Sequence, residues 1–142
     1  MKRNIFVIFT LLLTAFICNA QTAKTNEAAY ELDNVKAVGK NGLALNDFIS
    51  LWKSDPNIIL VDVRTPKEIK DTGIIKGAIN IDYRAEGYSK KILSLDKTKK
   101  YMFYCKSGGR SGKSVQYLLD NGFKNVHYLK DGGYAEFSKA LK

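Results

Sequence analysis

Short apolar runs alternate with stretches of helical periodicity along most of this chain, and that alternation constrains the fold more than any other feature. Residues 58–63 read IILVDV and residues 101–104 read YMFY, as in strands that are buried on both faces of a parallel sheet. Residues 43–54 and 111–120 instead place apolar side chains at helical spacing. Strands and helices in alternation predict an α/β domain with a mainly parallel sheet.

The expected elements follow one another without an internal repeat. Strands are expected at residues 35–38, 58–63, 78–81, 101–104 and 126–129, and helices at residues 43–54, 87–95, 111–120 and 133–141. A further helix is expected to begin after Thr65, because Thr65, Pro66 and Glu68 are the residue types of an N-cap, a first turn and a capping box. A chain of 142 residues suffices for one such domain.

The first twenty residues have the layout of a secretory signal peptide. The basic residues Lys2 and Arg3 precede a mostly apolar run over residues 5–17, and the small residues Cys18 and Ala20 suit a signal peptidase. The run is shorter than the roughly 20 residues needed to span a bilayer. We therefore expect cleavage near Ala20, no stable membrane insertion, and a periplasmic or secreted mature protein.

This layout divides the chain into three parts. Residues 1–20 are the expected signal peptide, residues 21–36 are a polar, alanine-rich linker, and residues 37–142 form the folded domain. A retained membrane anchor and a lipid on Cys18 are weaker alternatives, because the apolar run is short and a bulky isoleucine precedes that cysteine.

The net charge and the number of cysteines and histidines limit which ligands and partners the protein is expected to bind. The net charge of +9 comes mainly from scattered lysines, which favour encounters with anionic substrates or membrane surfaces, whereas an exported protein seldom meets nucleic acid. After cleavage the chain keeps one cysteine, Cys105, and one histidine, His127. These two cannot build a usual zinc site, so we expect no metal and no cofactor, and we expect His127 at a strand surface.

Cys105 follows the strand at residues 101–104 directly, and ligands of open parallel sheets bind outside the carboxyl ends of the strands. The next residues are small, flexible or basic and lead into a helix: Lys106, Ser107, Gly108, Gly109, Arg110 and Ser111. Glycines let successive N–H groups turn inward, and the helix dipole and two cations add positive potential. Such surroundings lower the pKa of a thiol, so Cys105 is the candidate nucleophile.

Several chemistries could use an activated Cys105. Cysteine-dependent phosphatases and arsenate reductases place five residues between the cysteine and an arginine, whereas four separate Cys105 from Arg110, which makes a tighter ring suited to a sulfur atom. A nucleotide-binding P-loop needs glycine at position 107, where this chain has Ser107. A thiol sensor stays open as an alternative, because an exposed thiolate oxidises readily outside the cytosol.

Three segments in order point to a family: VDVRTPKEIKDTGIIKGAINIDY at residues 61–83, YCKSGGRS at 104–111 and LLDNGFKNVHYLKDGG at 118–133. Together they resemble the single-domain rhodaneses, a family of thiosulfate sulfurtransferases with exported bacterial members. The resemblance implies a rhodanese-like three-layer domain with a central, mainly parallel five-stranded sheet flanked by helices. Two family residues are absent from the chain. One is the histidine that often precedes the Gly-Ala turn, and the other is a tryptophan after the Gly-Gly turn, where this chain has Tyr134 nearby.

The resemblance also implies an activity and its site. Cys105 would accept a sulfane sulfur from a donor such as thiosulfate, as a persulfide, and pass it to cyanide, a thiol or a periplasmic acceptor protein. The following loop would bind the substrate through Lys106, Ser107, Gly108, Gly109, Arg110 and Ser111. Asp62 and Arg64 match the family's Asp-x-Arg and would support the loop, with a plain surface ion pair as the alternative. A sulfur carrier dedicated to one partner is the alternative function.

Overall fold

The computed structural model describes residue 39 and residues 41–142 of the chain. The predicted signal peptide at 1–20, the predicted linker at 21–36 and the predicted strand at 35–38 therefore lie outside the described residues. Among the described residues, none of the helices has the length and apolar character required to cross a membrane.

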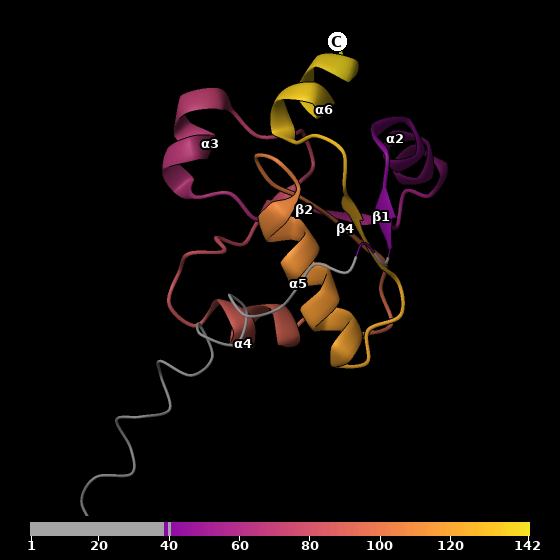
Figure 1. The fold of residues 1–142 in the computed structure, drawn as a ribbon, viewed down its shortest axis with the longest axis vertical. Coiled ribbons are helices and arrows are strands. Elements are labelled where there is room, and N and C mark those ends of the chain that lie inside the picture. The colour runs from indigo at the N-terminus through magenta and orange to yellow at the C-terminus, as the bar shows by residue number, and fades with distance from the viewer. Residues whose placement is uncertain (1–38, 40) are drawn as a thin grey trace, which may run out of the picture.

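A parallel sheet of five strands forms the centre of the described domain (Figure 1). The strands lie in the order β1-β5-β4-β2-β3, and each neighbouring pair is parallel. Their bounds are β1 (Gly42–Leu43), β2 (Ile59–Asp62), β3 (Ile79–Asn80), β4 (Tyr101–Tyr104) and β5 (Val126–Leu129). The predicted α/β fold with a five-stranded, mainly parallel sheet is confirmed.

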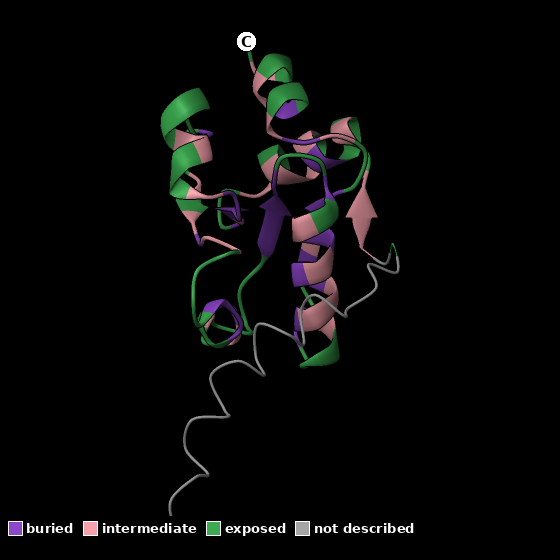
Figure 2. Cartoon of the chain, turned by 60° about the vertical axis from the view of Figure 1, so that its left-hand side comes forward, coloured by how far each residue is buried: buried purple, intermediate pink, exposed green. Residues whose placement is uncertain are grey.

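Helices cover both faces of this sheet and complete the three predicted layers. They are α2 (Leu45–Ser54), α3 (Pro66–Thr72), α4 (Tyr88–Leu93), α5 (Gly109–Asp120) and α6 (Tyr134–Ala140). Because successive side chains of a strand point to opposite faces, Phe103 packs against α4 and α5, whereas its neighbour Met102 packs against α2 and α6. Figure 2 shows the resulting burial, with a central strand in purple and α5 exposed at its far end.

The apolar cores of the two faces are built from different helices. Ile92 of α4 and Val115 and Leu118 of α5 are fully buried on one face. Phe48 of α2 and Phe137 of α6 are fully buried on the other, with their rings edge to face at 5.3 Å between centroids. The sheet is therefore fixed from both sides, which holds the carboxyl ends of its strands in register for a site.

Several element boundaries shift by one or two residues from the sequence-based expectation, and two of the differences affect the packing and the site. The edge strand β1 occupies Gly42–Leu43, where a helix was expected to begin, and Gly42 lets the ring of Tyr128 pack against the strand, because a β-carbon there would lie 2.9 Å from that ring. Helix α5 begins at Gly109, two residues before the predicted start. Gly109 and Arg110 therefore belong to the first turn of the helix with Ser111, and not to the preceding loop.

Candidate active site

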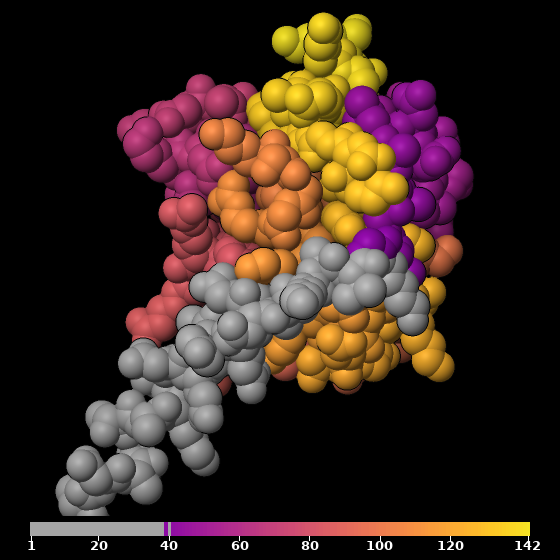
Figure 3. Space-filling model, in the orientation of Figure 1, coloured from indigo at the N-terminus to yellow at the C-terminus, as the bar shows by residue number. Residues whose placement is uncertain are grey.

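Cys105 lies at the carboxyl end of β4, directly before the turn into α5. Its side chain is 1 % exposed, and its backbone carbonyl accepts a hydrogen bond of 2.9 Å from the N–H of Tyr134 at the start of α6. The orange atoms of this turn lie between the magenta of α3 and the yellow of α6 (Figure 3). The thiol thus sits where the strand end, α3, α5 and α6 meet.

Hydrogen-bond donors surround the Cys105 sulfur. Burial opposes ionisation of the thiol, but hydrogen bonds from the Ser111 hydroxyl and from the backbone N–H groups of Ser107, Arg110 and Ser111 outweigh it, so the pKa of Cys105 is lowered. The Ser111 hydroxyl lies 3.5 Å from the sulfur. The geometry therefore stabilises a thiolate, or another anionic sulfur at this place, through backbone and hydroxyl donors.

Gly108 and Gly109, at the start of α5, have different surroundings. Gly108 caps α5 with a φ of 85°, and a β-carbon there would come within 2.8 Å of the carbonyl oxygen of Lys130. Gly109 is exposed, and a β-carbon there would meet no atom within 4 Å. Gly108 is therefore needed for a close approach to the end of β5 and for a left-handed backbone, whereas Gly109 leaves the outer side of the turn open.

The two cations of the turn are placed differently as well. Lys106 is exposed, as is its neighbour Ser107. The Arg110 guanidinium donates from both terminal nitrogens to the two carboxylate oxygens of Glu68 on α3, at 2.8 and 2.7 Å. Of these two cations, Arg110 is paired with the Glu68 carboxylate, whereas Lys106 is exposed to solvent. The role of Lys106 and Arg110 in attracting an anionic donor stays a prediction.

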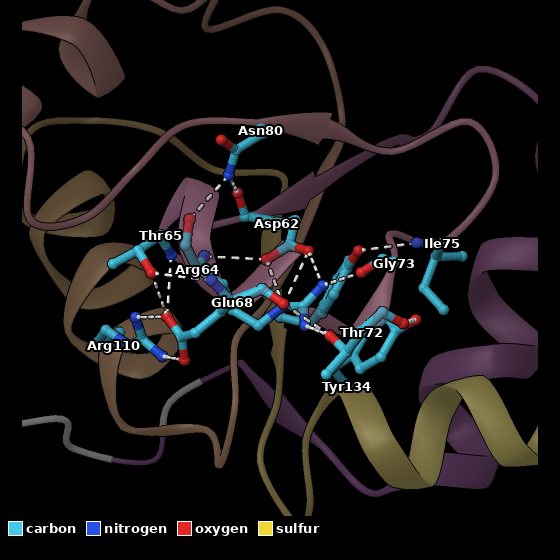
Figure 4. A network of polar contacts seen from close by, with 11 residues as sticks. Asp62, Arg64, Thr65, Glu68, Thr72, Gly73, Ile75, Asn80, Arg110 and Tyr134 are labelled. Carbon is cyan, nitrogen blue, oxygen red and sulfur yellow. Dashed lines mark hydrogen bonds and ion pairs between the residues drawn. The ribbon is translucent and has the colours of Figure 1, made fainter. Parts of the chain in front are cut away.

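Asp62 and Arg64 form a buried ion pair at the end of β2 (Figure 4). They are 0 % and 2 % exposed, and their closest nitrogen and oxygen atoms lie 2.6 Å apart. Arg64 also donates to the Thr72 hydroxyl and to the Gly73 carbonyl, both at 2.8 Å, which fixes the end of α3. The alternative of a plain surface ion pair is therefore wrong.

Tyr134 connects this ion pair to the Cys105 turn. The guanidinium of Arg64 lies 3.7 Å from the centroid of the Tyr134 ring, and the Tyr134 hydroxyl donates to the Thr72 carbonyl at 2.5 Å. The backbone N–H of the same tyrosine is the donor to the Cys105 carbonyl. Tyr134 therefore contacts both the buried ion pair and the Cys105 turn, and the loop-supporting role of Asp62 and Arg64 stays a prediction.

Sequence reasoning did not assign Glu68, Gly133 or Tyr134 to the site. Glu68 was recognised only as the capping-box residue of α3, which it also is, since its carboxylate accepts from the N–H of Thr65 at 2.9 Å. Gly133 packs against the Lys106 carbonyl, with no space for a β-carbon. The Gly-Gly turn followed by an aromatic residue is the sequence signal that could have found the last two.

His127 lies in β5, half-buried, and its Nδ1 atom has no hydrogen-bond partner among the described residues. Burial lowers its pKa, although a backbone hydrogen bond at Asn41 acts in the opposite direction. Across residue 39 and residues 41–142, no cluster of three or more His, Cys, Asp or Glu side chains is arranged to hold a metal ion.

Comparison with known proteins agrees with this fold. The model of the rhodanese-like domain matches residues 44–140, and the chain belongs to that family. The putative sulfurtransferase YtwF of Bacillus subtilis is 39% identical over 75 residues, which cover 53% of this chain and 70% of that protein. The tRNA sulfurtransferase of Colwellia psychrerythraea is 34% identical over 95 residues, which cover 66% of this chain but only 20% of that protein.

Among solved structures, a rhodanese-related protein from Thermoplasma volcanium superposes with a TM-score of 0.58 at 27% sequence identity. The match covers 70% of this chain and 92% of that one. Fold and family model together define a protein of the rhodanese-like family, and the relatives that match it include proteins named as sulfurtransferases.

Proposed function

We propose that the protein transfers sulfane sulfur from an anionic donor such as thiosulfate to a thiophilic acceptor, cyanide or a thiol, through a persulfide on Cys105. The observation that carries the proposal is the position of the Cys105 sulfur, which faces the hydroxyl of Ser111 and three backbone N–H groups of the turn. The three N–H groups, with a Ser111 hydroxyl whose one proton is shared between the sulfur at 3.5 Å and the Gly108 carbonyl at 3.1 Å, favour the anionic form of the sulfur, which is the nucleophile.

The proposed cycle has two displacements. The Cys105 thiolate attacks the outer sulfur of thiosulfate, a new S–S bond forms, and sulfite leaves with the electron pair of the bond that breaks. Cyanide then attacks the outer sulfur of the persulfide, thiocyanate is released, and the thiolate is restored. The negative charge lies on Sγ in the thiolate and on the adjacent outer sulfur in the persulfide, and the N–H groups of Ser107, Arg110 and Ser111 line the turn that would hold both.

Location and partners belong to the same proposal. The layout of residues 1–20 supports export, with cleavage near Ala20 and activity in the periplasm or outside the cell. The partners would then be a small anionic sulfur donor and a cyanide, thiol or protein acceptor. The exposed Lys106 beside the thiol supports an anionic donor.

Formation of thiocyanate from thiosulfate and cyanide tests the activity. We expect turnover by the wild-type chain and a loss of about a thousandfold or more in Cys105→Ser, as for removal of a covalent nucleophile. The unfolding transition of Cys105→Ser is the control, since an unchanged transition shows that the variant has lost the thiol and not the fold. Equal turnover by wild type and Cys105→Ser would remove Cys105 from the mechanism. No turnover, with rapid oxidation of Cys105 by peroxide, would favour the thiol sensor.

A further inference from the structure

The Arg110 side chain is engaged in the structure by a carboxylate from another helix. Glu68 projects from the first turn of α3, and its two oxygens accept one hydrogen bond each from the two terminal nitrogens of Arg110 (Figure 4). This is the two-pronged geometry in which arginine binds carboxylates and other oxyanions. The carboxylate therefore occupies the two terminal nitrogens of the Arg110 guanidinium, to which an oxyanion substrate could otherwise bind.

The Glu68 carboxylate is held in place independently of Arg110. Its Oε2 atom accepts from the backbone N–H of Thr65 at 2.9 Å and from the Thr65 hydroxyl at 3.0 Å. These contacts fix it to the start of α3. An anion that approaches Arg110 therefore meets a carboxylate that cannot easily swing away.

The pair also lies where a solute can reach it. The side chains of Arg110 and Glu68 are 18 % and 29 % exposed. The charges of Lys106, Arg110 and Glu68 sum to one positive charge, whereas Lys106 and Arg110 alone would give two. One extra elementary charge within a few ångströms of an anion matters more for a dianion than for a monoanion, because Coulomb energy scales with the product of the charges.

We propose that Glu68 is a selectivity residue, which screens Arg110 and thereby lowers the affinity of the Cys105 turn for dianions such as thiosulfate, sulfate and phosphate. The turn then favours sulfane-sulfur donors of lower charge, such as the persulfide of a small thiol. The donor preference rests on the proposed sulfur transfer, whereas the weak binding of dianions can be measured without turnover.

Glu68→Gln isolates the charge of this residue. Glutamine serves in a capping box as glutamate does, and its amide oxygen can still accept from Thr65 or Arg110. Asp71→Asn is the matched control, because Asp71 lies on the same helix and loses the same charge, but it is 54 % exposed and pairs with Lys67.

The primary readout is the dissociation constant of sulfate, obtained by following the amide resonances of Gly108 and Gly109 of the full chain. We expect Glu68→Gln to bind sulfate about three- to tenfold more tightly than wild type, as for one added charge at a partly exposed site. Asp71→Asn should match wild type. Adding Arg110→Gln to Glu68→Gln should abolish the gain, because the gain acts through Arg110.

Kinetic measurements distinguish electrostatic screening of Arg110 by Glu68 from a role in which the ion pair only holds α3 against α5. Glu68→Gln should lower KM for thiosulfate with little change in kcat, and should change KM much less for the persulfide of 2-mercaptoethanol, which is a monoanion. Equal sulfate affinity in wild type and Glu68→Gln would overturn the inference, whatever the activity. Tighter sulfate binding in Glu68→Gln, with no thiosulfate turnover by either protein, would support the screening role of Glu68 and contradict the proposed function instead.

Discussion

Gly133 packs against the backbone carbonyl of Lys106 so closely that a β-carbon on residue 133 would overlap it. The same β-carbon would lie 2.8 Å from the backbone nitrogen of Ser107. The next residue, Tyr134, donates its N–H to the Cys105 carbonyl at 2.9 Å. The start of α6 therefore forms one wall of the turn that carries the thiol, and residue 133 has to be glycine for the two segments to meet.

Gly133→Ala should displace the turn, because the clash is with backbone atoms that cannot rotate away. We expect a loss of about 2–4 kcal/mol in the free energy of unfolding, measured by urea denaturation. Gly109→Ala is the control, since a β-carbon at that position would meet nothing within 4 Å, and alanine suits a helix better than glycine does. Equal stability of the two variants would contradict this account of Gly133.

Arg64→Met should destabilise the protein strongly, because it leaves the fully buried Asp62 carboxylate without its cation. Breaking a buried ion pair from one side costs about 3–5 kcal/mol. Lys100→Met removes one partner of an exposed pair with Asp55 and should cost less than about 1 kcal/mol. Denaturant unfolding of both variants checks the contrast, and a small effect at Arg64 would speak against a supporting role for the buried pair.

The ion pair of Glu68 and Arg110 should make stability depend on acid pH. Hydrogen bonds from Arg110 lower the pKa of Glu68 from 4.5 to about 2. The ionised carboxylate therefore stabilises the folded state above pH 4.5, and this contribution is lost as the pH falls from 4.5 towards 2. After allowance for solvent screening we expect it to be worth about 1–2 kcal/mol.

The free energy of unfolding of wild type and Glu68→Gln, measured between pH 2 and pH 6, checks that contribution. The two curves should approach each other as the pH falls to 2, where about half of the wild-type carboxyl is protonated in the folded state, and should separate as the pH rises towards 5. Parallel curves over the whole range would show that the carboxylate of Glu68 does not contribute through its ionisation.

His127 should add a second pH dependence at milder acidity. Burial lowers its pKa below the ordinary 6.5, so the unfolded chain takes up a proton more readily than the folded one. Stability from the neutral ring is present above pH 6.5 and declines as the pH falls below that value. His127→Leu should flatten the decline of Tm between pH 7 and pH 5, and a decline as steep as that of wild type would assign it to other groups.

Sequence patterns predicted the parts of the molecule that depend on local chemistry. The capping box of Thr65 and Glu68 starts α3 as expected, and β4 and β5 have the predicted bounds. Cys105 lies at a strand end before a glycine turn, as its neighbours in the sequence indicated. In each case the residues that determine the feature lie within a few positions of one another.

The missed features depend on contacts between distant residues. Glu68 and Arg110 are 42 positions apart in sequence, and Tyr134 and Thr72 are 62 apart, so no local pattern could pair them. The strand β1 is two residues long and has no alternation to detect. Gly133 reads as an ordinary turn residue until the fold places the Lys106 carbonyl against it.

The most direct test of the account is an intact mass spectrum of the protein after brief exposure to thiosulfate and then to cyanide. We predict that wild type gains one sulfur atom, which maps to Cys105 and is released as thiocyanate, and that Cys105→Ser gains none. Absence of any added sulfur on wild type, while the same thiol reacts readily with peroxide, would contradict sulfur transfer through Cys105.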